Sequence, residues 1–217
     1  KRTIKTVWAP DRPFRLSVTT LDGSHQLVRK EAWRYNSRWQ LAGHEVSGAD
    51  GIGRATSYTY CEESDLVKPE LGCPYVGLLR AIDGPRDDVL DVTRIEHYTT
   101  DDAGCDAGGA CNFRSGDVAR ITNPVGLVSE FITYSADGRP LLVRGADGGL
   151  TAYEYGDRGW LISVSALAED PGITRKTTMV HRPNGLLEEL IEPDGARLKF
   201  GYDDSDRLVS VTEGDGG

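Results

Sequence analysis

The sequence contains little methionine and no long hydrophobic run. Met occurs once in 217 residues, and no Ala, Leu, Glu and Lys-rich amphipathic run reaches helical length. No stretch approaches the roughly 18 consecutive apolar residues of a membrane-spanning helix. The start, KRTIKTVWAP, has basic residues but lacks the apolar core of a signal peptide. We therefore expect few helices and no membrane insertion by this chain.

Basic residues are also scarce beside acidic ones. The chain has 25 Lys and Arg against 34 Asp and Glu, a formal net charge of -9. Because nucleic acids and anionic membranes are bound through clustered cations, this balance argues against both as partners. The chain also lacks an initiator Met and ends in the turn-like GDGG. We expect it to be a piece of a longer protein.

Glycine, in contrast, is abundant, and it accompanies a repeat. Gly accounts for 26 of the 217 residues, well above the typical share of about 7%. In the second half, short alternating runs end at four positions, which are Tyr134, Tyr155, His181 and Tyr202. Two residues earlier stand Ile132, Tyr153, Met179 and Phe200. Residues two apart share one face of an extended strand, so each pair predicts a strand.

A turn and a second strand follow each of these runs. Four residues after each terminal residue stand Gly138, Gly159, Gly185 and Asp206, types that tolerate positive φ. Alternating apolar positions follow each turn, with Glu188 as the misfit. The return turns read ADGG at 146–149 and PDGA at 193–196, and Asp-Gly is a strong hairpin signal. The second half therefore predicts successive antiparallel hairpins.

The first half repeats the idea less regularly. Residues 1–60 contain two further aromatic pairs, Trp33 with Tyr35 and Tyr58 with Tyr60. Residues 61–115 read as Cys-containing irregular loops around strands expected at 76–82 and 92–98, and residues 116–217, beginning with a strand at 118–122, hold the clear repeats. Because one hairpin cannot bury its own apolar face, we expect a single array over residues 1–217.

The ordered units resemble the YD repeat of the Rhs family. The likeness is carried by YSADGRPLLVRGADGGLTAYEYGDRGWLISV at 134–164 and PDGARLKFGYDDSDRLVSV at 193–211, and GDVARITNPVGLVSEFITY at 116–134 looks like the preceding repeat. The clear match covers about residues 116–217. Among the four terminal residues only Tyr202 is followed by Asp, and His181 stands in a Tyr position. A packing motif tolerates such variation better than a catalytic site does.

The resemblance implies an all-β fold in which successive antiparallel β-hairpins form a curved, continuous spiral sheet, part of a hollow β-shell. In related bacterial proteins this shell encloses a C-terminal polymorphic toxin until delivery. Similar repeats occur in Tc toxin complexes and in teneurins, which act in adhesion. The resemblance thus implies a structural segment that is not an enzyme and takes no cofactor. No DPxGxxDPxG-type region occurs here, so the protease activity of the family is not expected.

The resemblance also implies partners and a location. The partners would be the remainder of the chain's own shell, an enclosed C-terminal toxin and proteins of a secretion apparatus. The protein would be secreted or displayed at the cell surface after export from a bacterial cell, with assembly in the cytoplasm first. The alternative is a surface adhesion or carbohydrate-binding β module that acts through the exposed loops 61–75 and 100–117. Cutting an array leaves edge strands unpaired, so we expect self-association or fraying at the ends.

Four cysteines allow three pairings if all are bridged. No CxxC occurs, which argues against a zinc ribbon. We favour Cys61–Cys73 and Cys105–Cys111, because each bridge would link the two ends of an irregular segment between strands. Reduced cysteines and crossed pairs are the alternatives.

No other cluster predicts a catalytic or metal site. The acidic loop with Asp101, Asp102 and Asp106 lacks the spacing of an EF-hand, and GADGIG at 48–53 lacks the Lys-Ser/Thr of a phosphate loop and precedes a strand. The histidines are scattered, at positions His25, His44, His97 and His181. The aromatic pairs fit an inner packing face better than a sugar-binding platform. We expect the acidic loop to be solvated and GADGIG to form a hairpin turn. We expect His181 and the aromatic pairs to be packing residues.

Overall fold

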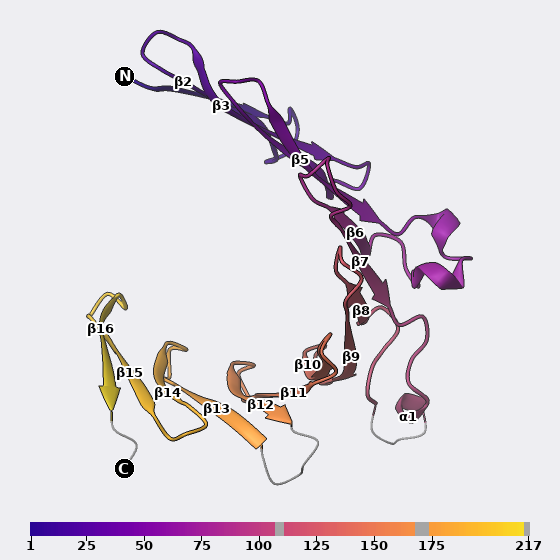
Figure 1. The fold of residues 1–217 in the computed structure, drawn as a ribbon, viewed down its shortest axis with the longest axis vertical. Coiled ribbons are helices and arrows are strands. Elements are labelled where there is room, and N and C mark those ends of the chain that lie inside the picture. The colour runs from indigo at the N-terminus through magenta and orange to yellow at the C-terminus, as the bar shows by residue number, and fades with distance from the viewer. Residues whose placement is uncertain (107–110, 168–173, 215–217) are drawn as a thin grey trace. The chain divides into compact units, whose positions relative to one another are not determined.

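The computed structural model of the chain describes residues 1–106, 111–167 and 174–214. The protein is all-β, with a 16-stranded antiparallel sheet in which the strands follow one another in chain order (Figure 1). The helices of the described residues are three short segments, η1 (Glu63–Asp65), η2 (Pro69–Leu71) and α1 (Ala103–Asp106). The predicted array of antiparallel hairpins is confirmed.

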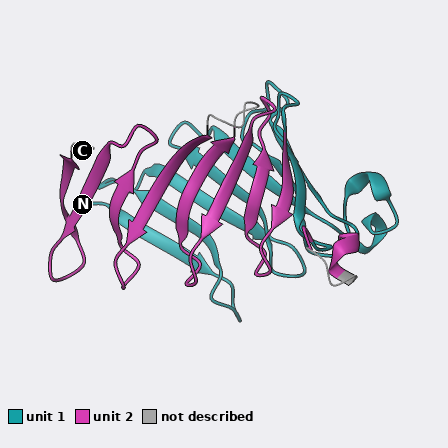
Figure 2. Cartoon of the chain, turned by 90° about the horizontal axis from the view of Figure 1, so that it is seen from below, with its two compact units in different colours: residues 1–101, 114–128 teal, residues 102–113, 129–217 magenta. Residues whose placement is uncertain are grey.

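The chain divides into two compact units (Figure 2). Unit 1 comprises residues 1–101 and 114–128, and unit 2 comprises residues 102–113 and 129–217. The strands of unit 1 are β1 (Thr3–Trp8), β2 (Arg15–Leu21), β3 (Leu27–Tyr35), β4 (Leu41–Gly48), β5 (Gly53–Tyr60), β6 (Leu79–Asp83), β7 (Val92–His97) and β8 (Val118–Thr122). Those of unit 2, with β9 starting at the boundary, are β9 (Val128–Tyr134), β10 (Pro140–Arg144), β11 (Leu150–Tyr155), β12 (Leu161–Leu167), β13 (Thr174–His181), β14 (Leu187–Ile191), β15 (Arg197–Tyr202) and β16 (Leu208–Gly214).

One type of turn closes hairpins at both ends of the strands. Between β15 and β16, the N–H of Asp203 donates to the carbonyl of Arg207, and the N–H of Asp206 donates to the carbonyl of Asp203, both at 3.0 Å. This is a three-residue hairpin loop with a bulge, whose third loop residue needs positive φ. The same two bonds recur in turns that begin at Asp22, Asn36, Asn123, Ser135, Gly145, Gly156, Arg182 and Glu192.

The position of positive φ explains the spacing of Gly in the repeats. In these turns it is occupied by His25, Trp39, Gly126, Gly138, Gly148, Gly159, Gly185, Gly195 and Asp206. Glycine adopts this conformation without steric cost, and Asp is one of the few residues that tolerate it. The turns at both ends of the strands therefore have the same backbone conformation, although their sequences, such as GDRG and ADGG, look different.

The two faces of the sheet differ in chemistry within each unit. In unit 2 the register places Leu190 between Met179 and Leu198, which forms an apolar ladder on one face. Ion pairs lie on the opposite face, and they are Glu130–Arg144 at 2.6 Å, Glu154–Lys176 at 2.8 Å and Glu189–Arg197 at 3.3 Å. In unit 1 the apolar face pairs Tyr58 with Ile82. Alternation along each strand produces this asymmetry.

Few side chains are buried by the chain itself. Among the described residues, the buried apolar side chains are those of Ala9, Cys61, Cys73 and Tyr134. On β16, Val209 and Val211 are 64% and 52% exposed. Among the described residues of β16, the apolar side chains are therefore largely exposed.

One strand departs from its expected bounds, and another contains a shift of register. The strand expected at 76–82 runs from Leu79 to Asp83, because Gly77 turns at φ 91° and its N–H bonds back to the carbonyl of Cys61. In β9 the register shifts, so that Phe131, and not Ile132, lies opposite Val143. Bulges of this kind change which residues share a face.

Candidate functional site

The repeat positions gather at the ends of the odd-numbered strands. Each of these strands ends in an aromatic residue or a histidine, which are Trp8, Tyr35, Tyr60 and His97 in unit 1 and Tyr134, Tyr155, His181 and Tyr202 in unit 2. We call this set the aromatic rim. The register shifts at or next to these residues, so a bulge accompanies each rim position.

Rim tyrosines tie each strand end to the preceding strand. The hydroxyl of Tyr60 donates to the carbonyl of Leu41 at 2.9 Å, and that of Tyr202 donates to the carbonyl of Leu187 at 2.9 Å. Both carbonyls belong to the first residue of the neighbouring strand. Tyr35 makes the same kind of bond to the carbonyl of Arg15, at 3.1 Å. The Tyr of the repeat is therefore a hydrogen-bonding group as well as a packing group.

Two rim residues, Trp8 and His97, did not emerge from the sequence pattern. The period between Tyr60 and His97 is lengthened by the loop at 61–78, which hides the repeat. The ring Nε2 of His97 lies 3.0 Å from the carbonyl oxygen of Leu79, the first residue of β6. His97 thus occupies the place that Tyr60 and Tyr202 hold in their repeats. A search for an aromatic residue or His at the end of each apolar run would have found it.

In unit 2 each rim turn packs on the positive-φ residue of the next turn. The guanidinium of Arg139 covers the Cα of Gly159, and the ring of Trp160 covers Gly185 so closely that a Cβ there would lie 2.9 Å from the ring. At the next turn, Asn184 Nδ2 donates to Asp206 Oδ1 at 3.0 Å. Glycine at 159 and 185 therefore provides both positive φ and room for the preceding turn.

Arginines of the rim turns lie over rim aromatics. Arg139 lies 5.5 Å from the ring centre of Tyr155, and Arg182 lies 4.9 Å from that of Tyr202. In each case the Arg belongs to one turn and the aromatic residue to the following repeat. Cation–π contacts at exposed sites contribute about 0.5–1 kcal/mol each. They add to the coupling between successive hairpins.

The rim of unit 1 carries a larger aromatic cluster. The ring of Phe14 lies 5.0 Å from Tyr35 and stacks on Trp39 at 5.5 Å. Arg12 lies 5.0 Å from the ring centre of Trp39. Trp39 has φ 61°, a conformation that is unfavourable for a bulky residue. The contacts of its ring with Phe14 and Arg12 offset the cost of this glycine-type conformation.

The remaining aromatic repeat positions lie on the apolar face of their unit. Trp33 stacks on His44 at 5.1 Å, and Tyr58 lies opposite Ile82. Tyr153 is paired with Val164, and Phe200 is paired with Val211. These residues pack along the sheet, and none converges with another on an enclosed pocket.

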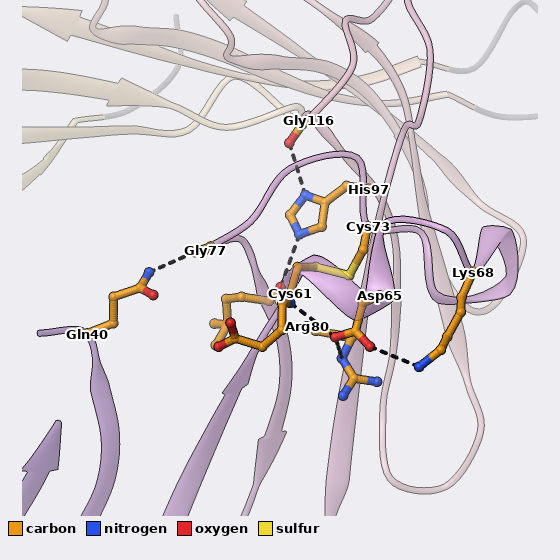
Figure 3. The surroundings of a disulfide bond; sticks show 11 residues. Gln40, Cys61, Asp65, Lys68, Cys73, Gly77, Arg80, His97 and Gly116 are labelled. Carbon is orange, nitrogen blue, oxygen red and sulfur yellow. Dashed lines mark hydrogen bonds and ion pairs between the residues drawn. A yellow bond between two sulfur atoms is a disulfide. The ribbon is translucent and has the colours of Figure 1, made fainter. Parts of the chain in front are cut away.

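Both cysteine pairs are disulfide-bonded in the structure. Cys61 and Cys73 have their Cα atoms 5.7 Å apart and are 0% and 3% exposed (Figure 3). This bridge staples the segment that contains η1 and η2. Cys105 and Cys111 are bridged with a Cα separation of 4.3 Å, across a loop that lies mostly outside the described residues. The described residues contain no free cysteine.

The acidic residues of the 101–106 loop cap backbone groups. Asp102 accepts hydrogen bonds from the N–H groups of Gly104 and Asn112, which lower its pKa, and Asp101 accepts from the N–H of Ser115 at 2.7 Å. The side chain of Asp106 lies outside the described residues. Within the described part of the chain, no group of three or more His, Cys, Asp and Glu side chains is arranged to hold a metal ion.

One polar cluster on the charged face of unit 2 combines a serine, a glutamate and a lysine. Ser163 Oγ donates to Glu154 Oε2 at 2.6 Å, and Lys176 Nζ donates to the same oxygen at 2.8 Å. The Lys176 and Ser163 hydrogen bonds lower the pKa of Glu154. Ser163 is 1% exposed, so its hydroxyl cannot reach a substrate. The cluster joins β11, β12 and β13.

Comparisons with known proteins agree with the repeat. Residues 183–217 match the model of the RHS repeat, so this part of the chain carries an RHS repeat. No curated protein matches the sequence significantly. No helix of the described residues is long and apolar enough for a bilayer.

Solved structures of Tc toxin components are similar at low identity. A TcdB2-TccC3-Cdc42 crystal structure matches at 15% identity and TM-score 0.44, with 97% of this chain and 12% of that chain covered. The Tc holotoxin pore of Photorhabdus luminescens with a TccC3 mutation matches at 14% identity and TM-score 0.44, over the same 97% and 12%. The TcdB2-TccC3 crystal structure matches at 12% identity and TM-score 0.28, over 100% and 18%. The chain thus spans less than a fifth of these proteins, and at these TM-scores the likeness transfers no function.

Proposed function

We propose that this chain, which carries an RHS repeat at residues 183–217, is a wall segment of a bacterial shell that encloses a C-terminal toxin. The observation that supports this most is the 16-stranded sheet, whose strands pair in chain order. In such an array each hairpin protects the edge of the one before it. We propose that residues 1–217 act as one continuous array within that wall.

The wall works mechanically and without catalysis. Within unit 2, apolar side chains such as that of Val209, which is 64% exposed, are left for other parts of the shell to cover. Its partners are then the remainder of its own shell, the enclosed toxin and, during delivery, proteins of a secretion apparatus. The rim contacts between successive turns keep the hairpins in register, so that the sheet separates the cargo from the producing cell.

The location follows from the same proposal. The protein is secreted or displayed at the cell surface after export, and its assembly begins in the cytoplasm. Disulfides persist in oxidising surroundings outside the cytoplasm, so the bridges at Cys61–Cys73 and Cys105–Cys111 support an extracellular final location.

Protease protection of the full-length protein tests the enclosure. The C-terminal segment should resist digestion in the wild type, and L198E should expose it, because Leu198 lies on the apolar face opposite Leu190. K199Q is the matched control, since Lys199 is the next residue on the same strand and points to the charged face, and a neutral Gln opposite Glu189 creates no like-charge pair. Equally rapid digestion of the C-terminal segment in the wild type and in L198E would reject enclosure.

Surface adhesion is the second candidate, and one observation favours it. The stapled segment at 61–78 displays Val67 at 81% and Tyr75 at 54% exposure. Rigid, exposed apolar side chains are typical of protein-binding surfaces. Binding of the protein to cells or glycans that is abolished by V67D, with protease protection unchanged, would favour adhesion over the shell.

A further inference from the structure

His97 is a buried histidine with two hydrogen-bonding partners of the same kind. It ends β7 and is 7% exposed. Its Nδ1 lies 3.0 Å from the carbonyl oxygen of Gly116 (Figure 3). Its Nε2 lies 3.0 Å from the carbonyl oxygen of Leu79. Both partners are main-chain carbonyls, which can only accept hydrogen bonds.

A neutral imidazole cannot satisfy this arrangement. It carries one N–H, so the lone pair of its other nitrogen would face a carbonyl oxygen. Burial leaves little room for water to take over the missing bond. An imidazolium carries two N–H groups and donates to both carbonyls. We propose that His97 is held as the imidazolium and forms a pH-sensitive clasp between Leu79 and Gly116, which both belong to unit 1.

The clasp joins the two longest connections of the rim. Leu79 follows the stapled 61–78 segment, and Gly116 belongs to the connection between β7 and β8. The backbone strengthens the same junction, because the N–H of His97 donates to the carbonyl of Gly72 and the N–H of Gly116 donates to that of Tyr98. Release of the His97 ring would therefore loosen both connections.

The direction of the pH effect follows from the charged form. Both ring bonds exist only while His97 is protonated, so the stabilisation is present at low pH and is lost as the pH rises through its titration. A histidine is the side chain suited to such a change near neutral pH.

Other ionisable groups lie on the elements that surround His97. They are Glu62, Glu63, Asp65, Lys68, Glu70 and Tyr75 on the stapled segment, Arg80 and Asp83 on β6, Arg94 and Glu96 on β7, Tyr98, Asp101, Asp102, Arg114 and Asp117 in the described part of the β7–β8 connection, and Arg120 on β8. Asp65 is matched by Lys68 at 3.4 Å and Arg80 at 3.9 Å.

Other rim residues show that the two-acceptor arrangement is particular to His97. Tyr60 and Tyr202 donate one hydroxyl bond each to the equivalent carbonyl. His181, the other rim histidine, leaves its Nδ1 without a hydrogen-bond partner among the described residues, and its ring lies 5.6 Å from that of Trp160. His181 and the H97Y variant therefore serve as internal comparisons.

Nuclear magnetic resonance of the histidine rings tests the charge directly. Both ring nitrogens of His97 should carry protons at a pH at which exposed His25 has lost one. A His97 ring with a single protonated nitrogen at every pH at which the protein is folded would overturn the proposal.

Amide exchange tests the consequence. After correction for the intrinsic effect of pH, protection of the Gly116 amide should fall about tenfold when His97 loses its proton, and the fall should be absent in H97Y. The Gly159 amide, which bonds to Gly156 in a turn without histidine, should show no such fall. An equal fall in H97Y would reject the clasp, and the ring measurement decides the matter if H97Y does not fold.

Discussion

Replacing the turn glycines by alanine separates the two roles of the positive-φ position. G138A tests backbone conformation alone, because Gly138 has φ 79° and a Cβ at this position would meet no atom within 4 Å beyond its chain neighbours. An L-residue at positive φ destabilises the folded state by roughly 1–2 kcal/mol. Alanine also lowers the conformational entropy of the unfolded chain, which stabilises the protein by about 0.4–1 kcal/mol. We therefore expect G138A to lower the free energy of unfolding by about 1 kcal/mol.

G185A should cost more because it also displaces a ring. A Cβ at Gly185 would lie 2.9 Å from Cζ2 and 3.1 Å from Cε2 of Trp160. Trp160 is held by His181 at 5.6 Å and by Arg158 at 5.3 Å, so its ring cannot retreat without breaking other contacts. Overpacking of this kind adds about 1–3 kcal/mol. The expected total for G185A is about 2–4 kcal/mol.

A double-mutant cycle in urea unfolding measures the packing part. In the W160A background the ring is absent, so G185A should cost about 1 kcal/mol, as G138A does. Equal costs for G138A and G185A in the wild-type background would refute the reasoning. So would a G185A cost that is unchanged by W160A.

Three further predictions concern single contacts. Y202F removes the hydroxyl hydrogen bond to the start of β14 and should lower the free energy of unfolding by about 0.5–1.5 kcal/mol. A stability equal to that of the wild type would show that this hydrogen bond does not stabilise the sheet. C61S/C73S removes a bridge across 12 residues, and in urea unfolding it should be about 3 kcal/mol less stable than the oxidised wild type. The reduced wild type should be about as unstable as the variant. The side chain and N–H of Arg207 lower the pKa of Asp203, so its contribution is present above the unfolded-state value near 3.9 and is lost as the pH falls through the lower folded value. Amide exchange at the β15–β16 turn should show this loss in the wild type and not in D203N, in which Asn still accepts the backbone bonds.

The repeat and the fold class could be predicted from local sequence. Tyr202, Asp206 and the apolar alternation of β15 and β16 are encoded within one short segment, because strand period and turn conformation depend on near neighbours. The hairpin order follows from the short connections. The repeat that ends at His97 is harder to recognise in the sequence, because the long disulfide-linked segment at 61–78 separates His97 from Tyr60.

The sequence by itself determined the strand alternation, the positive-φ turns and the succession of hairpins. These properties depend on residues a few positions apart. Only the tertiary structure decided that Trp160 covers Gly185, that Phe131 faces Val143, and that both nitrogens of His97 meet carbonyls from separate connections. Those contacts join residues of different strands, and their geometry depends on bulges and loop paths that no local pattern specifies.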